Sequence, residues 1–219
     1  MALSKFNFNS FDVTTVASTG LGFNASANGF STINPGAMTL IKTLTASSSS
    51  NLTFIHGSSD VVLDSTYPVY LFKYINLHPA TDGQETHVNF TTDGTNFNVT
   101  KTSTVFDAEH NEDDGYANLS YNTAMDLAQG TGDQQIGRST ANDNDSCISG
   151  ELFLFNPSST TFVKHYVARS SEAHTQPRES NFYIAGYCNT SSAITGVRFD
   201  FGSGNIDAGT IKLYGIKDS

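Results

Sequence analysis

Apolar and polar residues alternate with a period of two along most of this chain, which is the pattern of β-strands with one buried face. Runs of this kind, most of them five to nine residues long, are separated by turns rich in Pro, Gly, Asn and Ser. The predicted strands span residues 39–45, 51–55, 69–77, 87–92, 97–106, 149–155, 162–169, 181–189, 194–201 and 209–216. This arrangement predicts an all-β fold, an antiparallel β-sandwich that is jelly-roll-like.

Three segments carry more specific predictions. The run 69–77 is expected as an interior strand because both of its faces are apolar, with Tyr70, Phe72 and Tyr74 on one and Leu71, Ile75 and Leu77 on the other. The dipeptide Asp93-Gly94 predicts a hairpin turn between residues 87–92 and 97–106. In the last run, 209–216, Ile211 and Leu213 share one face, so this strand is expected to belong to the core.

Residues 107–147 interrupt the alternation. Acidic residues cluster at 107–114, and Gly, Gln, Asn and Asp are scattered through 130–145. We interpret this stretch as one long loop excursion with a single helical turn near residues 123–128. Loops of this length in a compact domain are usually functional or assembly-related. The expected organisation is an extended N-terminal arm at residues 1–30 and a single β-sandwich domain at residues 31–219.

The net charge of the chain argues against two classes of partner. Asp and Glu outnumber Lys and Arg by 21 to 11, which gives a net charge of −10. We therefore expect no surface that neutralises nucleic-acid phosphates and none that binds an anionic membrane. No apolar stretch approaches the ~20 residues of a membrane-spanning helix. Only 15% of the residues are charged, so the polar surface is mainly neutral.

No residue pattern predicts a catalytic, cofactor or metal site. The histidines lack the spacings that hold zinc from one element, and the acidic segments 107–114 and 142–145 do not fit an EF-hand loop. Cys147 and Cys188 are expected as reduced, partly buried thiols. Glu151 is the one candidate acid within a rigid strand pattern, and no second strand-borne acid is an obvious partner. A glycoside hydrolase is therefore the last of the function hypotheses.

Aromatic residues outside the predicted strands suggest an assembly interface. Phe6, Phe8 and Phe11 lie in a polar N-terminal stretch, and exposed aromatics near a terminus usually need a partner that covers them. Tyr116 and Tyr121 lie in the predicted loop excursion, where a neighbouring subunit can cover them. Docking of the arm on its own domain is an open alternative. These two tyrosines and Tyr67 are also candidates to stack on a sugar ring.

Three passages resemble structural proteins of marine tailed bacteriophages: the opening MALSKFNFNSFDV, the internal LFLFNPSSTTFVKHY and the ending SAITGVRFDFGSGNIDAGTIKLYGIK. In those proteins a sandwich domain closes with a strand that corresponds here to residues 203–216. The resemblance implies a virion component without catalysis, assembled in several copies. It further implies a homotrimer as the preferred state and other virion proteins, such as the major capsid protein, as partners.

Two functions follow from these observations, and both place the chain in the virion without a cofactor. The first is a capsid decoration (cement) or head-fibre protein that assembles as a multimer on the particle. The alternative is a tail appendage or receptor-binding module that recognises a glycan of the host surface. A glycan array separates them, because reproducible binding supports adhesion and uniform blanks support a scaffold.

Overall fold

The computed structural model describes residues 20–23, 26, 30–33 and 36–217. The chain divides into two compact units, Met1–Thr39 and Leu40–Ser219. In the first unit, β1 (Gly20–Phe23) pairs antiparallel with β2 (Phe30–Ile33). The expected end of the arm at residue 30 falls inside this hairpin, and the second unit begins later than the sequence indicates.

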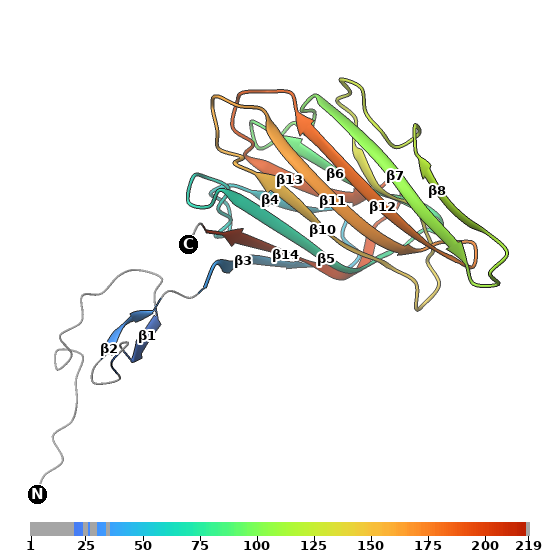
Figure 1. Cartoon of the computed structure of the whole chain (residues 1–219), viewed down its shortest axis with the longest axis horizontal. Helices are drawn as coiled ribbons and strands as arrows, with labels where there is room; N and C mark the ends of the chain where they lie inside the picture. The colour runs from blue at the N-terminus through green and yellow to red at the C-terminus, as the bar shows by residue number, and fades with distance from the viewer. Residues whose placement is uncertain (1–19, 24–25, 27–29, 34–35, 218–219) are drawn as a thin grey trace, which may run out of the picture. The chain divides into compact units, whose positions relative to one another are not determined.

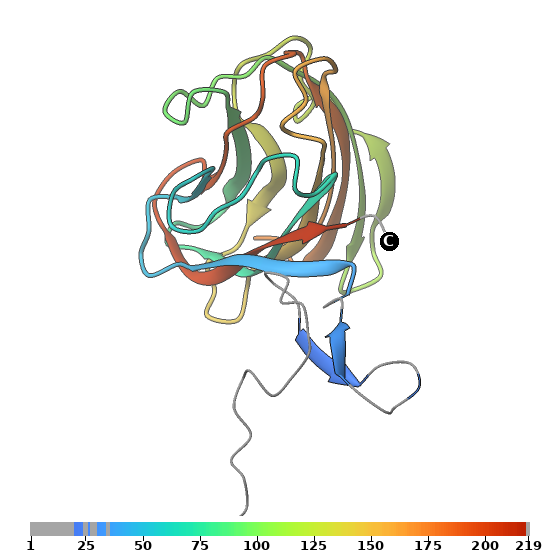
Figure 2. The ribbon, with the colours of Figure 1, turned by 90° about the vertical axis from the view of Figure 1, so that its left-hand side faces the viewer.

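The second unit is a sandwich of two antiparallel sheets, which lie face to face in Figures 1 and 2. The predicted all-β sandwich is confirmed, and no helix occurs among the described residues. The large sheet has, in spatial order, β3 (Met38–Thr45), β14 (Ile206–Ile216), β5 (Val69–Pro79), β10 (Ile148–Phe155), β11 (Lys164–Ala173), β12 (Arg178–Cys188), β7 (Lys101–Asn111) and β8 (Ala117–Tyr121). The small sheet has β4 (Leu52–Ile55), β13 (Gly196–Phe201), β6 (Gln84–Thr91) and β9 (Gln134–Thr140).

Eight of these strands have the connectivity of a jelly roll. The first pairs with the last, β3 with β14, and the inner pairs are β4 with β13, β5 with β10 and β6 with β9. This is a long folded-back chain rolled into two layers of four strands. The remaining strands are insertions, β7 and β8 after β6, and β11 and β12 after β10. All four join the large sheet beyond β10 and widen it to eight strands.

Aromatic rings from both layers form the core between the sheets. Phe72 of β5 lies 5.3 Å from Phe54 of β4 and 5.7 Å from Phe199 of β13, measured between ring centroids. All three side chains are fully buried. Their edge-to-face and tilted contacts are favourable beyond the area that they bury. The strand at residues 69–77 is interior, as predicted, because β5 lies between β14 and β10.

The predicted hairpin between residues 87–92 and 97–106 is wrong, although its turn forms. Gly94 has a φ of 78°, and Asp93 Oδ1 accepts the backbone N–H of Thr95. Beyond the turn the chain leaves the small sheet, since β6 pairs with β13 and β9 whereas β7 pairs with β12 and β8. A turn signal fixes the local reversal of the chain but not the sheet that the next strand joins.

The single long loop predicted at residues 107–147 is also wrong. The second half of β7, the edge strand β8 and strand β9 all lie in this stretch. Its acidic run was assigned to this loop, yet Asp107 and Glu109 are buried on the inner face of β7, and Gln134 of β9 is fully buried. Polar groups that are paired in the interior break the apolar alternation by which strands are recognised.

Two local predictions also differ from the structure. The stretch 123–128 holds a turn in which Met125 donates its backbone N–H to the carbonyl of Asn122 (3.3 Å), and no helix forms there. The alternation places Leu77 on the outer face of β5, but Leu77 is 1% exposed. An extra residue in β5, where Asn76 has a φ of 51°, forms a bulge against β10 and turns Leu77 into the core.

The described residues include no helix of the length and apolar character needed to cross a bilayer.

The final strand yields a stability prediction. β14 lies between β3 and β5, and its Leu213 is fully buried while Lys212 points to the outer face. We expect Leu213→Ala to lower the free energy of unfolding by about 3 kcal/mol, because it leaves a cavity in the core. Lys212→Ala is the control and should cost less than about 1 kcal/mol. Urea unfolding followed by circular dichroism checks both, and equal losses would contradict the assignment of the faces.

Candidate interaction surface

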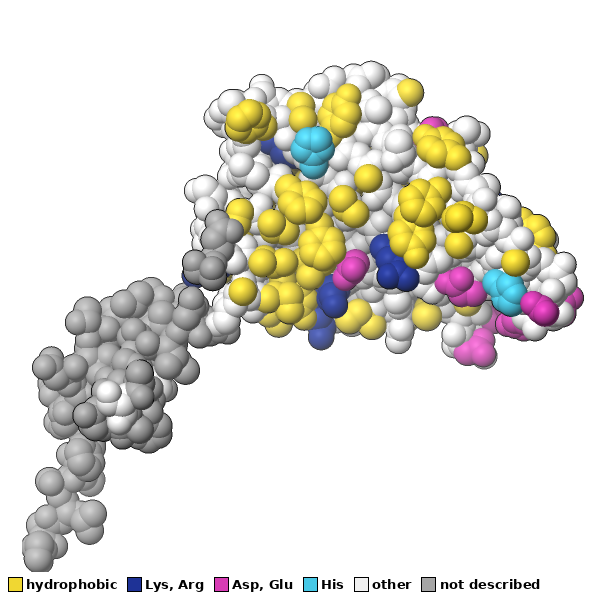
Figure 3. All heavy atoms as spheres, viewed as in Figure 1, with side chains coloured by type: hydrophobic (Ala, Val, Ile, Leu, Met, Phe, Trp, Pro, Cys, Tyr) yellow, Lys and Arg dark blue, Asp and Glu magenta, His cyan; other side chains and the backbone are white. Residues whose placement is uncertain are grey.

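The outer face of the eight-stranded sheet, which points away from the small sheet, carries rows of side chains across neighbouring strands (Figure 3). The register defines two rows that we name here. The apolar row consists of Tyr214, Leu71, Phe153, Val167, Ala185 and Thr104. The central row, beside it, consists of Lys212, Lys73, Glu151, Arg169, Tyr183, Phe106 and Tyr121.

Side chains of the central row stack on one another. The rings of Phe106 and Tyr183 lie 4.8 Å apart at an interplanar angle of 10°, and the guanidinium carbon of Arg169 lies 5.2 Å from the centroid of the Tyr183 ring. Because β7 and β11 flank β12 on opposite sides, both faces of the Tyr183 ring are occupied. The row therefore offers little flat aromatic surface on which a sugar ring could stack.

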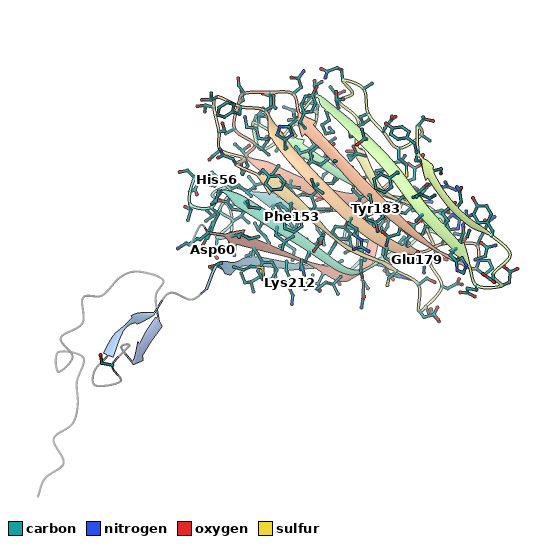
Figure 4. All side chains as sticks on the ribbon, viewed as in Figure 1. His56, Asp60, Phe153, Glu179, Tyr183 and Lys212 are labelled. Atoms are coloured by element: carbon teal, nitrogen blue, oxygen red, sulfur yellow. The ribbon has the colours of Figure 1, made fainter. Side chains whose placement is uncertain are left out.

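A groove of about 350 Å³ lies on this face, over β10, β11, β12 and β7. Phe153, Tyr183 and Phe106 contribute aromatic side chains to it, and Figure 4 labels the first two. Between them the register places the shorter Val167 and Ala185. Val167 and Phe106 are each 44% exposed. The groove is therefore an open apolar site of a size that accepts one or two apolar side chains of another protein.

Packing of the two sheets does not require the outer face of the large sheet to be apolar. An antiparallel sheet with one solvated face usually carries polar residues there. Here the apolar row and the neighbouring Val69, Phe155 and Ile216 run across interior strands. Leu71 of this row is 4% exposed, whereas Phe155 and Val167 are 39% and 44% exposed. Apolar surface with exposed members of this kind marks an interaction site.

The structure gives the five candidate interface residues three different outcomes. Tyr121 ends the central row beside Phe106, is 53% exposed, and donates its hydroxyl to Asp126 (2.6 Å). Tyr116, just before β8, is 40% exposed and donates its hydroxyl to Glu109 (3.3 Å). The two tyrosines lie at opposite ends of the edge strand and not in one cluster. Phe6, Phe8 and Phe11 lie outside the described residues, and their role stays a prediction.

Sequence reasoning missed the centre of this surface. Residues 152–155 of β10 are all apolar, Leu152 and Leu154 facing the core and Phe153 and Phe155 facing outward. This double-sided pattern was the available signal. The stacking of Phe106 on Tyr183 could not be inferred, because the two residues come from strands that are far apart in the sequence and neighbours only in the sheet.

Glu151 and the cysteines are where the sequence placed them. Glu151 lies in β10 on the outer face, and its cross-strand neighbours are the basic residues Lys73 and Arg169. Opposite charges at directly opposite positions of neighbouring strands are favourable, which gives Glu151 a structural role. Cys147 and Cys188 are both free thiols, as predicted, and Cys188 is fully buried.

On the small sheet, His87, Asp133 and Asp200 bring ligand-type atoms within 4.8 Å of one another. These residues could hold a metal ion, but Arg198 already lies 2.9 Å from Asp133 Oδ1 and 2.7 Å from Asp200 Oδ2. Burial by itself lowers the pKa of His87, and the carboxylates of Asp200 and Glu85 outweigh it, so the pKa is raised. Both observations favour a network in which Arg198 occupies the place of a cation and His87 lies between the carboxylates of Glu85 and Asp200.

A second buried cluster lies under the inserted strands. Glu172 of β11 is 1% exposed and accepts hydrogen bonds from the backbone N–H of Arg138 (3.1 Å) and Ser139 (3.1 Å) and from the hydroxyl of Thr140 (3.0 Å). Burial raises the pKa of this carboxyl to about 7, because these hydrogen bonds only partly offset the desolvation of the charge.

No family model matches this chain, and neither the curated proteins nor the solved structures contain a match. The fold, the outer face and the sequence passages that resemble phage structural proteins are therefore the observations that bear on function.

The buried Glu172 gives a pH prediction. The folded state holds the proton of this carboxyl up to about pH 7, whereas the unfolded chain releases it near the ordinary value of 4.5. Its contribution to stability is therefore present below pH 4.5 and is lost as the pH rises to 7, by about 3 kcal/mol. Glu172→Gln should remove this decline, as measured by urea unfolding from pH 4.5 to 8. Parallel pH profiles of the two proteins would contradict the prediction.

Proposed function

We propose that this chain is a non-enzymatic structural protein of a bacteriophage virion, a capsid decoration (cement) or head-fibre protein that assembles as a multimer. The outer face of the eight-stranded sheet is the surface that packs against a neighbouring protein. The observation that carries the proposal is the apolar row with its groove, exposed on the interior strands of a widened jelly roll.

Two further observations support this function. Jelly rolls are common among viral capsid proteins and lectins, although a fold alone does not determine function. The three sequence passages that resemble phage structural proteins include LFLFNPSSTTFVKHY, residues 152–166, which contains the second half of β10 and the first three residues of β11. The same passage therefore contributes Phe153 and Phe155 to the outer face, and Val167 follows it directly.

Side chains of the two rows contribute to such an interface in two ways, through affinity and through orientation. Aromatic and arginine side chains at the centre of a protein interface contribute most of its affinity. Phe153, Tyr183 and Arg169 are side chains of this kind. The charges of Lys73 and Glu151, beside Arg169, add little affinity but restrict how a partner can be oriented on the face.

The function is tested by the copy number of the chain in purified virions, measured by quantitative mass spectrometry against the major capsid protein. A copy number comparable to that of the capsid protein is expected for a decoration or head-fibre protein. A few copies per particle would favour the tail appendage, and a glycan array would then follow. Absence from the particles would overturn the proposal.

Val167→Lys tests the surface directly. A lysine in the groove must be desolvated without a partner when the face is covered, so particle occupancy should fall at least tenfold. Ser171→Lys is the matched control, since it adds the same charge to the same strand and face, near Glu179 and outside the groove. Both residues are exposed, so both variants should unfold at the wild-type temperature. Equal occupancy of the two variants would contradict the assignment of the interface.

A further inference from the structure

Strand β8 is one edge of the eight-stranded sheet, and its only hydrogen-bonded neighbour in the described chain is β7. All five residues of β8, Ala117–Tyr121, are exposed, and Leu119 is 70% exposed. An edge strand presents a row of backbone N–H and C=O groups that can template another strand.

The hydrogen bonds at the two ends of the β7–β8 pair show which backbone groups of β8 point away from the sheet. The backbone N–H of Asn111 donates to the carbonyl of Tyr116 (2.9 Å), and that of Asn122 donates to the carbonyl of Val105 (2.9 Å). In an antiparallel pair, bonded and non-bonded positions alternate. The backbone groups of Asn118 and Ser120 therefore point to β7, and those of Ala117, Leu119 and Tyr121 point away from the sheet.

This edge lacks the features by which proteins usually protect an edge strand. Charged residues, proline and bulges block pairing with another chain. The sequence of β8, Ala-Asn-Leu-Ser-Tyr, has no charge and no proline, and its register with β7 is regular. The opposite edge of the sheet, β3, carries Lys42.

We propose that β8 pairs antiparallel with β8 of a second copy of this chain, about a two-fold axis at Leu119. This register places Leu119 opposite Leu119 of the partner subunit, and Ala117 opposite the partner subunit's Tyr121. All of these are positions whose backbone groups point outward, so the pair forms inter-chain hydrogen bonds at each of them. The two eight-stranded sheets become one continuous sheet.

The side chains of β8 suit this occupant. In a symmetric pair every residue near the axis meets its own kind or a near neighbour, so a charged residue would face a like charge. Ala117, Leu119 and Tyr121 share the outer face, where Leu119 meets its equivalent and the small Ala117 faces the large Tyr121. Asn118 and Ser120, on the other face, are neutral and polar. An uncharged strand with this small–large complementarity favours a second copy over an unrelated partner.

This contact rests on the proposed function, because it supplies one of the contacts through which the chain would assemble. It also extends the candidate surface. Tyr121 ends the central row, so two copies joined at β8 would present both central rows on one shared sheet, offset along the strands by the separation of Ala117 from Tyr121.

Sedimentation velocity of the full chain tests the pairing. The wild type should dimerise with increasing concentration, while Leu119→Lys and Leu119→Glu should each raise the dissociation constant at least tenfold, because like charges then meet at the axis. An equimolar mixture of the two variants should recover the dimer, since opposite charges face each other only in this register. Leu119→Thr, uncharged and suited to a strand, is the control and should still dimerise.

Three results would overturn the pairing: a wild-type chain that stays monomeric at all concentrations, a Leu119→Lys variant that associates like the wild type, or a mixture that does not recover. The exposure of Leu119 means that none of the variants should disturb folding, which circular dichroism verifies. Failure of the proposed function can be distinguished from failure of the pairing. A chain absent from virions that still shows this dimer and charge recovery refutes the function and leaves the pairing intact.

Discussion

A four-stranded sheet cannot cover an eight-stranded one, and much of this structure follows from that mismatch. The small sheet packs on the strands of the basic jelly roll, while β11, β12, β7 and β8 extend beyond it. Strand β9 and the segment before it cover part of the extension: β9 packs against β11, and Leu127 donates its backbone N–H to Ser103 of β7. The inner face there combines apolar residues such as Phe182 and Ile184 with buried polar residues, of which Lys101, Lys164 and Glu172 are at most 1% exposed.

The buried polar residues also explain which strands could and could not be predicted from the sequence. Strands whose inner residues are apolar, such as β5 and β14, were located within two or three residues of their observed ends. Strand β9 and the second half of β7 were read as loop because Gln134, Asp107 and Glu109 are buried in paired networks. The positions of the inserted strands in the sheet could not be predicted for a different reason. Periodicity identifies strands, but it carries no information on their order in a sheet.

The same limit applies to the interaction surface. Tyr121 was identified from its type and position, and it does lie on the outer face. Phe153, Val167 and Tyr183 were read as ordinary strand residues, and only the register between β10, β11 and β12 places them together. Widening the sheet therefore has two consequences at once. It creates an inner face on which buried polar groups must be paired. It also creates an outer face that is wide enough for both rows and ends at the edge strand β8.

If the outer face of the large sheet is an interface, it is covered when the protein is assembled in the particle. Hydroxyl-radical footprinting of the chain, free in solution and assembled in the particle, measures this directly. We expect Phe153, Val167 and Tyr183 to lose reactivity several-fold on assembly, while Phe97 and His87, on the side of the small sheet, keep theirs. Unchanged reactivity at Tyr183 and Phe153, with protection at Phe97 and His87, would contradict it.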